Sequence, residues 1–336
     1  MKVLTVTNMY PTAERPGWGA FVGSQVASLR AAGIETDVLI VDGWRGKLEY
    51  ARAVFKLRKA VADGEYDLVH AHYGLTGLVA RAQTQLPLVV SFCGDDLYGK
   101  SDSNGDAKLS SLPLAHLHRR LARVVDGVIV KSEAMRRLLP ARAAEAAQVI
   151  PNGVDFDRFH PGDRTAARAN FDLSPDAKYV LFPYDPSRPR KNVSLVDAAI
   201  AQVYQRTGQE VRRLTLFDKP ADEIAQAMRA ADVLALASFW EGSPNVVKEA
   251  MASCLPVVTA DVGDVVDTLG DTPGCSVVLR TPTDFADAII AALEHGVPTD
   301  GRARIAHLRA DQIAARVISV YGAALGGATQ PVAGAA

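Results

Sequence analysis

Residues 232–264 read DVLALASFWEGSPNVVKEAMASCLPVVTADVGD, and this stretch decides the fold of the chain. Residues 233–237 form a short apolar run that predicts a buried strand, and residues 245–253 have the composition of a helix. The polar segment between them is therefore expected to be a strand-to-helix turn. Turns of this kind carry the ligand sites of α/β proteins.

The residues of this turn suit the binding of an anion. Pro244 is expected at the first helical position, because a proline has no N–H to leave unpaired there. The amides of Asn245, Val246 and Val247 would then point free along the helix axis. Glu241 precedes the turn, and Glu249 follows eight positions later. A glutamate pair at this spacing is by itself more often a solvated helix face.

The context of the two glutamates changes that interpretation. The stretch resembles the signature of the retaining GT-B glycosyltransferases of family 4, whose usual form is EGxPxxxxEAMAxGxPVVxxDVGG. It departs from this form at Cys254-Leu255, where the family usually has a glycine, and at Asp264, where it usually has a second glycine. KEAM and the terminal GD make it most similar to the teichuronic acid and exopolysaccharide biosynthesis subgroup. The resemblance implies an α/β fold of the GT-B type, with two doubly wound Rossmann-like lobes facing a cleft.

The resemblance also implies how a donor would bind. A nucleoside diphosphate sugar, with UDP or GDP as the nucleotide, would be the co-substrate, and no other cofactor is expected. Glu249 would bind the ribose hydroxyls, Glu241 would lie near the transferred hexose-type sugar, and the donor phosphate would take the acceptor proton with retention. The other donor-binding residues would be those of the turn: Gly242, Ser243, Pro244, Asn245, Val246 and Val247.

A group of cations in the second half of the chain is a candidate phosphate clamp. The loop at 185–192 lies between a predicted strand at 179–183 and a predicted helix at 194–204, and it carries Arg188, Arg190 and Lys191. Lys191 matches the family's lysine well, whereas the compressed spacing leaves the arginine open, and we favour Arg188. Solvated surface charge is the alternative. Glu241, Arg188 and Lys191 are thus the expected catalytic residues, and no metal is expected.

The chain opens with a βαβ pattern: a strand at 2–7, a helix at 22–32 and a strand at 37–41. The loop before the helix contains Gly17, Gly19 and Gly23. Its length and its Gly-x-Gly-x-x-x-Gly spacing do not fit a dinucleotide fingerprint. In the family that the chain resembles, a glycine-containing loop here approaches the donor diphosphate and the acceptor, and Gly19 is our candidate.

Two further strands of the first half end in polar residues that resemble the acceptor side of the family. Residues 66–73 are similar to DVVHAHY, and residues 88–96 are similar to a strand ending in HGxD, with Cys93 in place of the histidine. The expected acceptor-side residues are His72, Cys93 and Asp95. His70 and His72 share one face of a strand, and since they lack metal-binding partners we favour a hydrogen-bonding structural role.

Length and composition indicate a two-domain enzyme. A chain of 336 residues suits two domains, which we place at 1–162 (acceptor side) and 163–308 (nucleotide-sugar side). Residues 309–325 should form a helix returning to the first lobe, and 326–336 a disordered tail. Three separated cysteines favour a reducing cytoplasm, the net charge of −1 argues against nucleic-acid binding, and neither a secretory signal nor a membrane span is evident.

Three segments have more ordinary interpretations. A helix at 47–61 is expected to place Leu48, Ala51, Phe55 and Val61 against the sheet and Arg45, Arg52, Lys56 and Lys59 outward; a membrane-surface helix at the inner face of the membrane is the alternative. Residues 100–111 are expected to form a mobile loop on the acceptor side. The Asp-x-Asp pair at 155–157 is expected to be structural.

The predicted function is a metal-independent, retaining transfer of a hexose-type sugar to a glycan, lipid-linked or small-molecule acceptor. One alternative is a sugar-nucleotide epimerase of the same architecture. The other is a degenerate lobe that binds a nucleotide sugar without catalysis, which the substitution at Cys93 keeps open.

Overall fold

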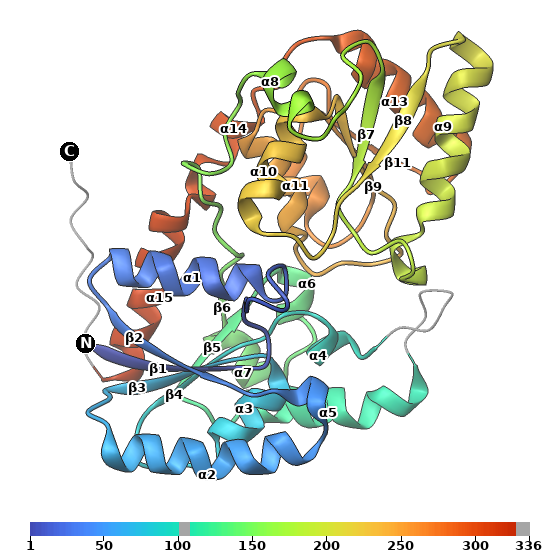
Figure 1. Ribbon diagram of the computed structural model, residues 1–336. Helices are drawn as coiled ribbons and strands as arrows, with labels where there is room; N and C mark the ends of the chain where they lie inside the picture. Colours follow the sequence, from blue (N-terminus) through green and yellow to red (C-terminus); the bar gives the residue numbers. More distant parts are fainter. Residues whose placement is uncertain (101–107, 327–336) are drawn as a thin grey trace.

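The computed structural model describes residues 1–100 and 108–326, which form two α/β lobes, each around a parallel sheet (Figure 1). The sheet of the first lobe has the order β2-β1-β3-β4-β5-β6, and that of the second has the order β11-β10-β9-β7-β8. Every paired strand is parallel to its neighbour. The predicted architecture of two doubly wound α/β lobes is confirmed.

The first lobe runs from β1 to β6. Its strands are β1 (Lys2–Thr7), β2 (Glu35–Ile40), β3 (Leu68–His72), β4 (Leu88–Ser91), β5 (Gly127–Val130) and β6 (Gln148–Val149). Its helices are α1 (Ala20–Ala31), η1 (Gly43–Arg45), α2 (Leu48–Asp63), α3 (Gly74–Ala80), α4 (Asp95–Tyr98), η2 (Leu109–Ser111), α5 (Leu112–Leu121), α6 (Glu133–Arg136) and α7 (Ala141–Ala146).

The second lobe follows a linker at 150–163. Its strands are β7 (Lys178–Phe182), β8 (Val211–Thr215), β9 (Val233–Leu236), β10 (Val257–Ala260) and β11 (Ser276–Val278). Its helices are α8 (Arg164–Ala169), η3 (Pro189–Lys191), α9 (Val193–Thr207), α10 (Ala221–Ala230), α11 (Asn245–Ala252), α12 (Val265–Leu269), α13 (Pro282–His295), α14 (Gly301–Arg304) and η4 (Ala306–Leu308), and the chain then enters α15 (Ala310–Ala324).

Helices cover both faces of each sheet, as alternating strands and helices require. In the first lobe, α1 and α15 lie on the face towards the second lobe, and α2, α3 and α5 lie on the opposite face (Figure 1). In the second lobe, α9 and α13 pack on one face, and α10 and α11 lie on the other. The face of the second lobe that carries α11 is therefore turned towards the first lobe.

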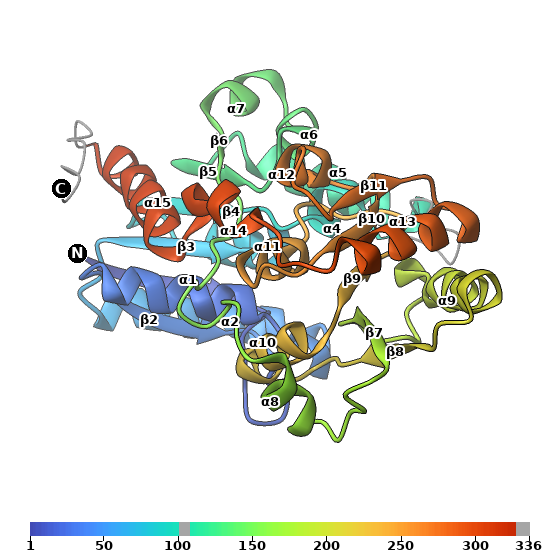
Figure 2. The same ribbon diagram turned by 90° about the horizontal axis from the view of Figure 1, so that it is seen from above.

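The last helix joins the two lobes. Although α15 follows the second lobe in the chain, it packs on α1 and on strands β4 and β5 of the first lobe (Figure 2). The hydroxyl of Tyr321 in α15 lies 2.6 Å from Nδ1 of His70 in β3, and the backbone of Val154 in the linker pairs with the segment that leads into α15. The chain thus crosses between the lobes twice.

The face of α2 that packs inward differs from the expected one. Ala53, Leu57 and Val61 are buried against the sheet, whereas Leu48 and Phe55 are 73% and 72% exposed. Ala51 is exposed as well, so the expected placement of Leu48, Ala51 and Phe55 against the sheet is wrong. Positions 50, 53, 54, 57, 60 and 61 form a broader apolar stripe than the one containing Phe55, and this broader stripe is the one that packs.

Some expectations fall outside what the structure describes. Most of the expected mobile loop, residues 101–107, and all of the expected tail except Gly326 lie outside the described residues. In residues 1–100 and 108–326, every helix is too short or too polar to cross a membrane.

Candidate functional site

A cavity of about 430 Å³ lies between the two lobes, beside the turn that connects β9 to α11. Its walls are built from residues that follow the carboxyl ends of strands in both lobes, which is where open α/β sheets bind their ligands. The first lobe contributes Met9, Gly17, Trp18, Gly19, Ala20, Phe21, Tyr73, Cys93 and Asp95; the second contributes Pro183, Tyr184, Arg188, Arg190, Lys191, Phe217, Asp218, Lys219, Ala221, Ile224, Asn245, Val246 and Glu249, and Phe159 comes from the linker.

Glu241, directly before the turn, is held by two cations. Its Oε1 lies 2.5 Å from Nζ of Lys191, and its Oε2 lies 3.0 Å from a guanidinium nitrogen of Arg190. Arg190 also donates to the backbone oxygen of Trp240 and stacks on the Trp240 ring at 4.4 Å, while the ammonium of Lys191 lies 3.5 Å from the centre of the Tyr184 ring. These contacts fix both cations at the edge of the cavity.

Glu241 and the cations that hold it are charged at neutral pH. Burial by itself would raise the pKa of Glu241, but the adjacent Lys191 and Arg190 outweigh that effect and lower it. Burial lowers the pKa of Lys191 to about 8, and the Glu241 carboxylate only partly offsets this change. Glu241 is therefore ionised at pH 7 and Lys191 is mostly protonated.

The N-terminus of α11 opens beside these cations. Pro244 is the residue before the first helical position, with φ −71° and ψ 114°, so the expectation that it occupies the first position is off by one residue. The amide of Val247 lies 3.3 Å from the carbonyl oxygen of Pro244. In the described part of the chain, the amides of Asn245 and Val246 have no backbone acceptor, and both residues line the cavity. The helix therefore presents two free donors to an anion.

Glu249 lies in α11, about one helical turn after Asn245, and also lines the cavity. Its carboxylate makes neither a hydrogen bond nor an ion pair with any residue in 1–100 or 108–326. Burial raises the pKa of Glu249 to about 7, although Lys248 and Arg158 act in the opposite direction. This carboxylate is thus an available acceptor for hydroxyl groups of a ligand.

The arginine favoured from the sequence has a different position. Arg188 lines the cavity, but its side chain is 54% exposed and pairs with Asp185 at 3.7 Å. Arg190, the residue left as the second choice, is the arginine that contacts Glu241. The compressed loop places Arg190 and Lys191 in the short η3 helix, so that both turn inward, and the sequence spacing alone could not separate Arg188 from Arg190.

Gly19 brings the first lobe to the same cavity. It precedes α1 in the left-handed conformation, with φ +69°, and a Cβ here would lie 2.2 Å from the backbone carbon of Met9. Only glycine fits this position. Two residues earlier, the amide of Gly17 donates to Oδ1 of Asp218 at 3.1 Å, which connects the glycine loop to the second lobe.

Comparison with known proteins places the chain in a family. The Glycosyl transferase 4-like domain matches residues 23–153, and Glycosyl transferases group 1 matches residues 187–295. The D-inositol 3-phosphate glycosyltransferase of Kribbella flavida is 30% identical over 301 residues, which cover 77% of this chain and 70% of the relative. The chain belongs to the group 1 glycosyltransferases.

One further relative bears on the extent of this chain, and one solved structure bears on its fold. The D-inositol 3-phosphate glycosyltransferase of Geodermatophilus obscurus is 32% identical over 295 residues, 73% of this chain, and the match spans only 63% of that relative's length. The Anabaena HepE protein, solved with UDP and in a separate structure with UDP-glucose, superposes with a TM-score of 0.66 in the UDP complex at 20% identity, covering 95% of this chain and 98% of that one. This likeness confirms the predicted GT-B fold.

Of the three expected acceptor-side residues, two line the cavity and one does not. Cys93 and Asp95 line the cavity, and burial raises the pKa of both side chains. His72 does not line it: the ring is buried beside His70, with 4.3 Å between ring centres. Neither ring nitrogen of His72 has a partner within the described residues, so the hydrogen-bonding role favoured for both histidines holds for His70 and is wrong for His72. Burial holds the pKa of His72 well below its usual value.

Four other residues that were expected to bind the donor do not line the cavity: Gly242, Ser243, Pro244 and Val247. A contact that the sequence did not reveal connects this turn to the linker. Nζ of Lys248, a buried side chain, donates to Oγ of Ser243 at 3.0 Å and to the carbonyl oxygen of Asn152 at 3.2 Å. The side chain of Asn152 in turn donates to Asn245 at 3.1 Å. The linker therefore holds the N-terminus of α11 from two sides, and Lys248 in KEAM was the signal that could have indicated it.

The metal-binding capacity of the described residues is limited. In 1–100 and 108–326, His, Cys, Asp and Glu side chains nowhere gather in a group of three or more that could hold an ion. Asp155 and Asp157 form no such group: Oδ1 of Asp155 accepts from the amides of Asp157 and Arg158 and shapes the linker turn.

Proposed function

We propose that this protein is a retaining, metal-independent glycosyltransferase that moves a hexose-type sugar from a nucleoside diphosphate sugar. The observation that carries the proposal is the grouping of Lys191, Arg190 and two α11 amides around one end of the interlobe cavity, with Glu249 further along. Within residues 1–100 and 108–326, the two amides and the Glu249 carboxylate have no partner. The cations and amides suit a diphosphate, and a free carboxylate suits the ribose hydroxyls.

Positive charge at this site would act where the reaction develops negative charge. As the glycosidic bond breaks, the leaving diphosphate gains charge, and fixed donors aimed at it stabilise the transition state. Lys191, Arg190 and the amides of Asn245 and Val246 supply such donors, with Arg188 at the rim. Their combined charge can take the place of a divalent ion, so we expect turnover to survive EDTA.

The state of Glu241 supports retention without a covalent enzyme intermediate. A carboxylate held by two cations is a poor nucleophile, because both of its oxygens already accept charged hydrogen bonds. We infer that Glu241 instead orients the sugar and stabilises the positive character that develops on it. The donor phosphate would then take the acceptor proton on the same face.

UDP is the first nucleotide to test, followed by GDP. The Anabaena HepE protein, which shares the fold, binds UDP and UDP-glucose in its solved structures. We propose that Tyr184, Phe217 and Ile224, which line the same cavity, enclose the base.

For the acceptor, we propose a second cavity of about 270 Å³ in the first lobe, which shares Trp18 with the donor cavity. Its lining includes Asn8, whose buried Oδ1 has no partner within the described residues, and two arginine–tryptophan stacks, Arg15 on Trp18 at 4.2 Å and Arg45 on Trp44 at 4.8 Å. Aromatic rings and guanidinium groups suit a polyol that carries an anion.

The names of the relatives suggest which acceptors to try first. The two relatives reported above are D-inositol 3-phosphate glycosyltransferases, so a cyclic polyol phosphate is the first acceptor to test. The exopolysaccharide subgroup, predicted from KEAM and the terminal GD, remains a proposal in which a lipid-linked or glycan acceptor takes the same place.

We further propose a cytoplasmic location with contact to the inner face of the membrane. On η1 and α2, Trp44 is 61% exposed, Leu48 73% and Phe55 72%, and basic residues surround them. This combination suits an anionic bilayer. Flotation with anionic liposomes tests it, and a double variant with Lys56→Glu and Lys59→Glu should abolish the binding; unchanged binding would end the idea.

A panel of UDP-, GDP- and ADP-sugars, each with inositol phosphate and with lipid-linked acceptors, tests the main proposal. Released nucleotide is measured with and without EDTA, and proton NMR gives the configuration of the new linkage. Transfer with retention supports the proposal. Epimerised donor without transfer would indicate an epimerase, and nucleotide binding without any turnover would indicate a binding subunit.

A further inference from the structure

Trp240, the residue before Glu241, determines where Arg190 lies. The Arg190 guanidinium lies 4.4 Å from the centre of the Trp240 ring, in cation–π contact, and donates to the backbone oxygen of Trp240 at 2.9 Å. The backbone oxygen of Arg190 accepts from the amide of Phe239 at 3.0 Å. From this position Arg190 reaches the Glu241 carboxylate. A change in the orientation of the Trp240 ring would therefore move the guanidinium of Arg190.

The segment that carries Trp240 is held from within the second lobe by another arginine. Arg280 donates to the backbone oxygens of Ser238 and Phe239 at 3.2 and 3.1 Å, and its guanidinium lies 5.4 Å from the centre of the Phe239 ring. These contacts fix the backbone before Trp240 and do not involve its ring. The orientation of the ring therefore depends on what packs against the ring itself.

The first lobe supplies an aromatic partner for the Trp240 ring. Tyr98 ends α4, and the centre of its ring lies 6.0 Å from that of Trp240, with the ring planes tilted by 46°. Aromatic pairs usually have their centres about 4.5 to 7 Å apart, so these two rings are in contact. Asp95, three residues earlier in α4, lines the donor cavity. Residues three apart share a helix face, so α4 directs both side chains towards the second lobe.

Helix α4 is fixed to the rest of the first lobe by α5. Nδ1 of His118 lies 3.0 Å from the backbone oxygen of Asp96, and Arg119 donates to the backbone oxygen of Leu97 at 2.6 and 3.1 Å. Both contacts hold the backbone of α4 directly before Tyr98. Tyr98 therefore offers the second lobe a fixed surface.

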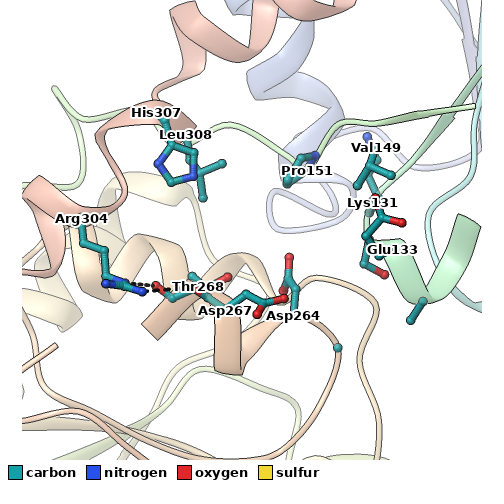
Figure 3. A pocket seen from close by; sticks show the side chains of 13 residues that line it. Lys131, Glu133, Val149, Pro151, Asp264, Asp267, Thr268, Arg304, His307 and Leu308 are labelled. Carbon is teal, nitrogen blue, oxygen red and sulfur yellow. Dashed lines mark hydrogen bonds between the residues drawn. The ribbon is translucent and has the colours of Figure 1, made fainter. Parts of the chain in front are cut away.

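The hydroxyl of Tyr98 interacts with residues other than Trp240. Burial raises the pKa of this hydroxyl, a hydrogen bond with Ser132 opposes the change, and the nearby Asp264 carboxylate adds to it. Ser132 and Asp264 line a cavity of about 410 Å³ between the lobes, where Figure 3 shows Asp264 on the α12 side. The contact with Trp240 is thus made by the ring of Tyr98, so that a phenylalanine at this position would keep the contact.

We propose that Tyr98 and Trp240 are positioning residues for Arg190. Tyr98, fixed to the first lobe, supports the Trp240 ring, and the ring holds the guanidinium where a diphosphate would meet it. Neither Tyr98 nor Trp240 lines the donor cavity, so both act through Arg190. The inference rests on the proposed function, in which Arg190 binds the donor diphosphate. Through Tyr98, the first lobe then contributes to diphosphate affinity without a direct contact.

Nitrogen-15 NMR of the full chain, without any ligand, tests the positioning. The Arg190 Nε–H signal is assigned by its loss in Arg190→Lys. Tyr98→Leu should shift this signal, because the Trp240 ring reorients once its support is lost, whereas Tyr98→Phe keeps the ring and should leave the signal in place. Tyr204→Leu, at a tyrosine that is 60% exposed on α9, is the control. A signal that Tyr98→Leu moves no more than the control does overturns the inference.

Calorimetry with UDP, and with inorganic pyrophosphate as a probe of the cations alone, measures the effect on binding. Tyr98→Leu should weaken binding of both by about 2- to 10-fold, the range expected for an aromatic pair, and Tyr98→Phe should bind both as the wild type does. In an Arg190→Met background, Tyr98→Leu should cause no further loss, because the residue through which it acts is absent. An equal loss with and without Arg190 overturns the inference.

Failure of this inference is distinguishable from failure of the proposed function. If the wild type binds neither UDP nor GDP nor pyrophosphate, the proposed function fails, and the Arg190 signal alone decides whether Tyr98 positions Arg190. If the wild type binds them and Tyr98→Leu binds them equally well, only the inference fails. Tyr98→Met, with a longer side chain, replaces Tyr98→Leu in the same measurements if that variant fails to fold.

Discussion

The turns that follow β4 and β9 meet across the interlobe cleft, where a Cβ on Gly242 would lie 3.6 Å from the carbonyl oxygen of Cys93. Each turn holds a carboxylate, and the two turns differ in the groups that donate hydrogen bonds to it. In the first lobe, Asp96 accepts from the amides of Cys93, Gly94 and Gly74 at 2.8 to 3.1 Å. In the second lobe, Glu241 accepts from side-chain cations and leaves the helix amides open.

This difference explains why we place the diphosphate on the second lobe. In the turn after β4, the buried carboxylate of Asp96 already accepts from the amides of Cys93 and Gly94, so these amides cannot bind an anionic ligand. The turn after β9 combines open amides with two cations, and the single carboxylate between them does not neutralise the group. An anionic ligand gains charged hydrogen bonds only on the second side.

The largest expected effect comes from removing a cation of the second turn. Lys191→Met should lower kcat/KM for the donor by about 10²- to 10³-fold, as loss of a fixed donor to a developing anion usually does. Initial-rate kinetics measures this, with Arg142→Met on the exposed surface of α7 as the control. A loss no greater than that of the control would remove Lys191 from the site.

The sequence allowed much of this second turn to be predicted. Residues 233–237 and 245–253 were expected to be a strand and a helix, and they correspond to β9 and α11 within one residue. Local pattern was sufficient because the strand, the proline and the helix are consecutive. By contrast, the choice between Arg188 and Arg190 depends on how a compressed loop folds into η3, and spacing could not decide it.

Features that depend on contacts between distant residues could not be read from the sequence. The link from Lys248 to Asn152 joins residues 96 positions apart, and it connects the turn after β9 to the linker. Phe55 was misplaced because α2 has two apolar stripes, and only packing determines which one is buried.

The second prediction divides the roles of the two glutamates. Glu249→Gln should weaken binding of free nucleoside diphosphate by about 1.5 to 3 kcal/mol, as expected for a lost charged hydrogen bond. Glu241→Gln should reduce mainly kcat, because Glu241 acts on the positive character that develops on the transferred sugar. Affinity for the free nucleotide should change little, because the free nucleotide has a ribose but no transferred sugar. Calorimetry and kinetics on both variants measure the two effects. Equal loss of nucleotide affinity in both would contradict this division.

The third prediction concerns the turn of the first lobe. Asp96→Asn replaces an oxygen acceptor by an NH₂ group that faces amide donors, so it should lower the free energy of unfolding by about 1 to 3 kcal/mol. Nucleotide affinity should not change. Denaturant unfolding and calorimetry check both, with the exposed Asp176→Asn as the control; a selective loss of nucleotide affinity would show that this turn also binds the donor.

The smallest expected effect is on the pH profile of donor kcat/KM, which reports the free enzyme. The raised pKa of Glu249, about 7, should give an acid limb on which activity rises with pH as the carboxylate ionises. The lowered pKa of Lys191, about 8, should give a basic limb on which activity falls as the ammonium loses its proton. Glu249→Gln should lose the acid limb, and an unchanged limb would assign it to another group.

Calorimetric titration of UDP against uridine, and of GDP against guanosine, in the presence of EDTA tests most directly whether the second turn binds the diphosphate. We predict that one diphosphate binds without metal and more than about 100-fold more tightly than its nucleoside, which is about 2.7 kcal/mol, and that Lys191→Met removes most of this difference. Equal affinity of nucleoside and diphosphate, or binding of the diphosphate only when Mg²⁺ is added, would contradict the account.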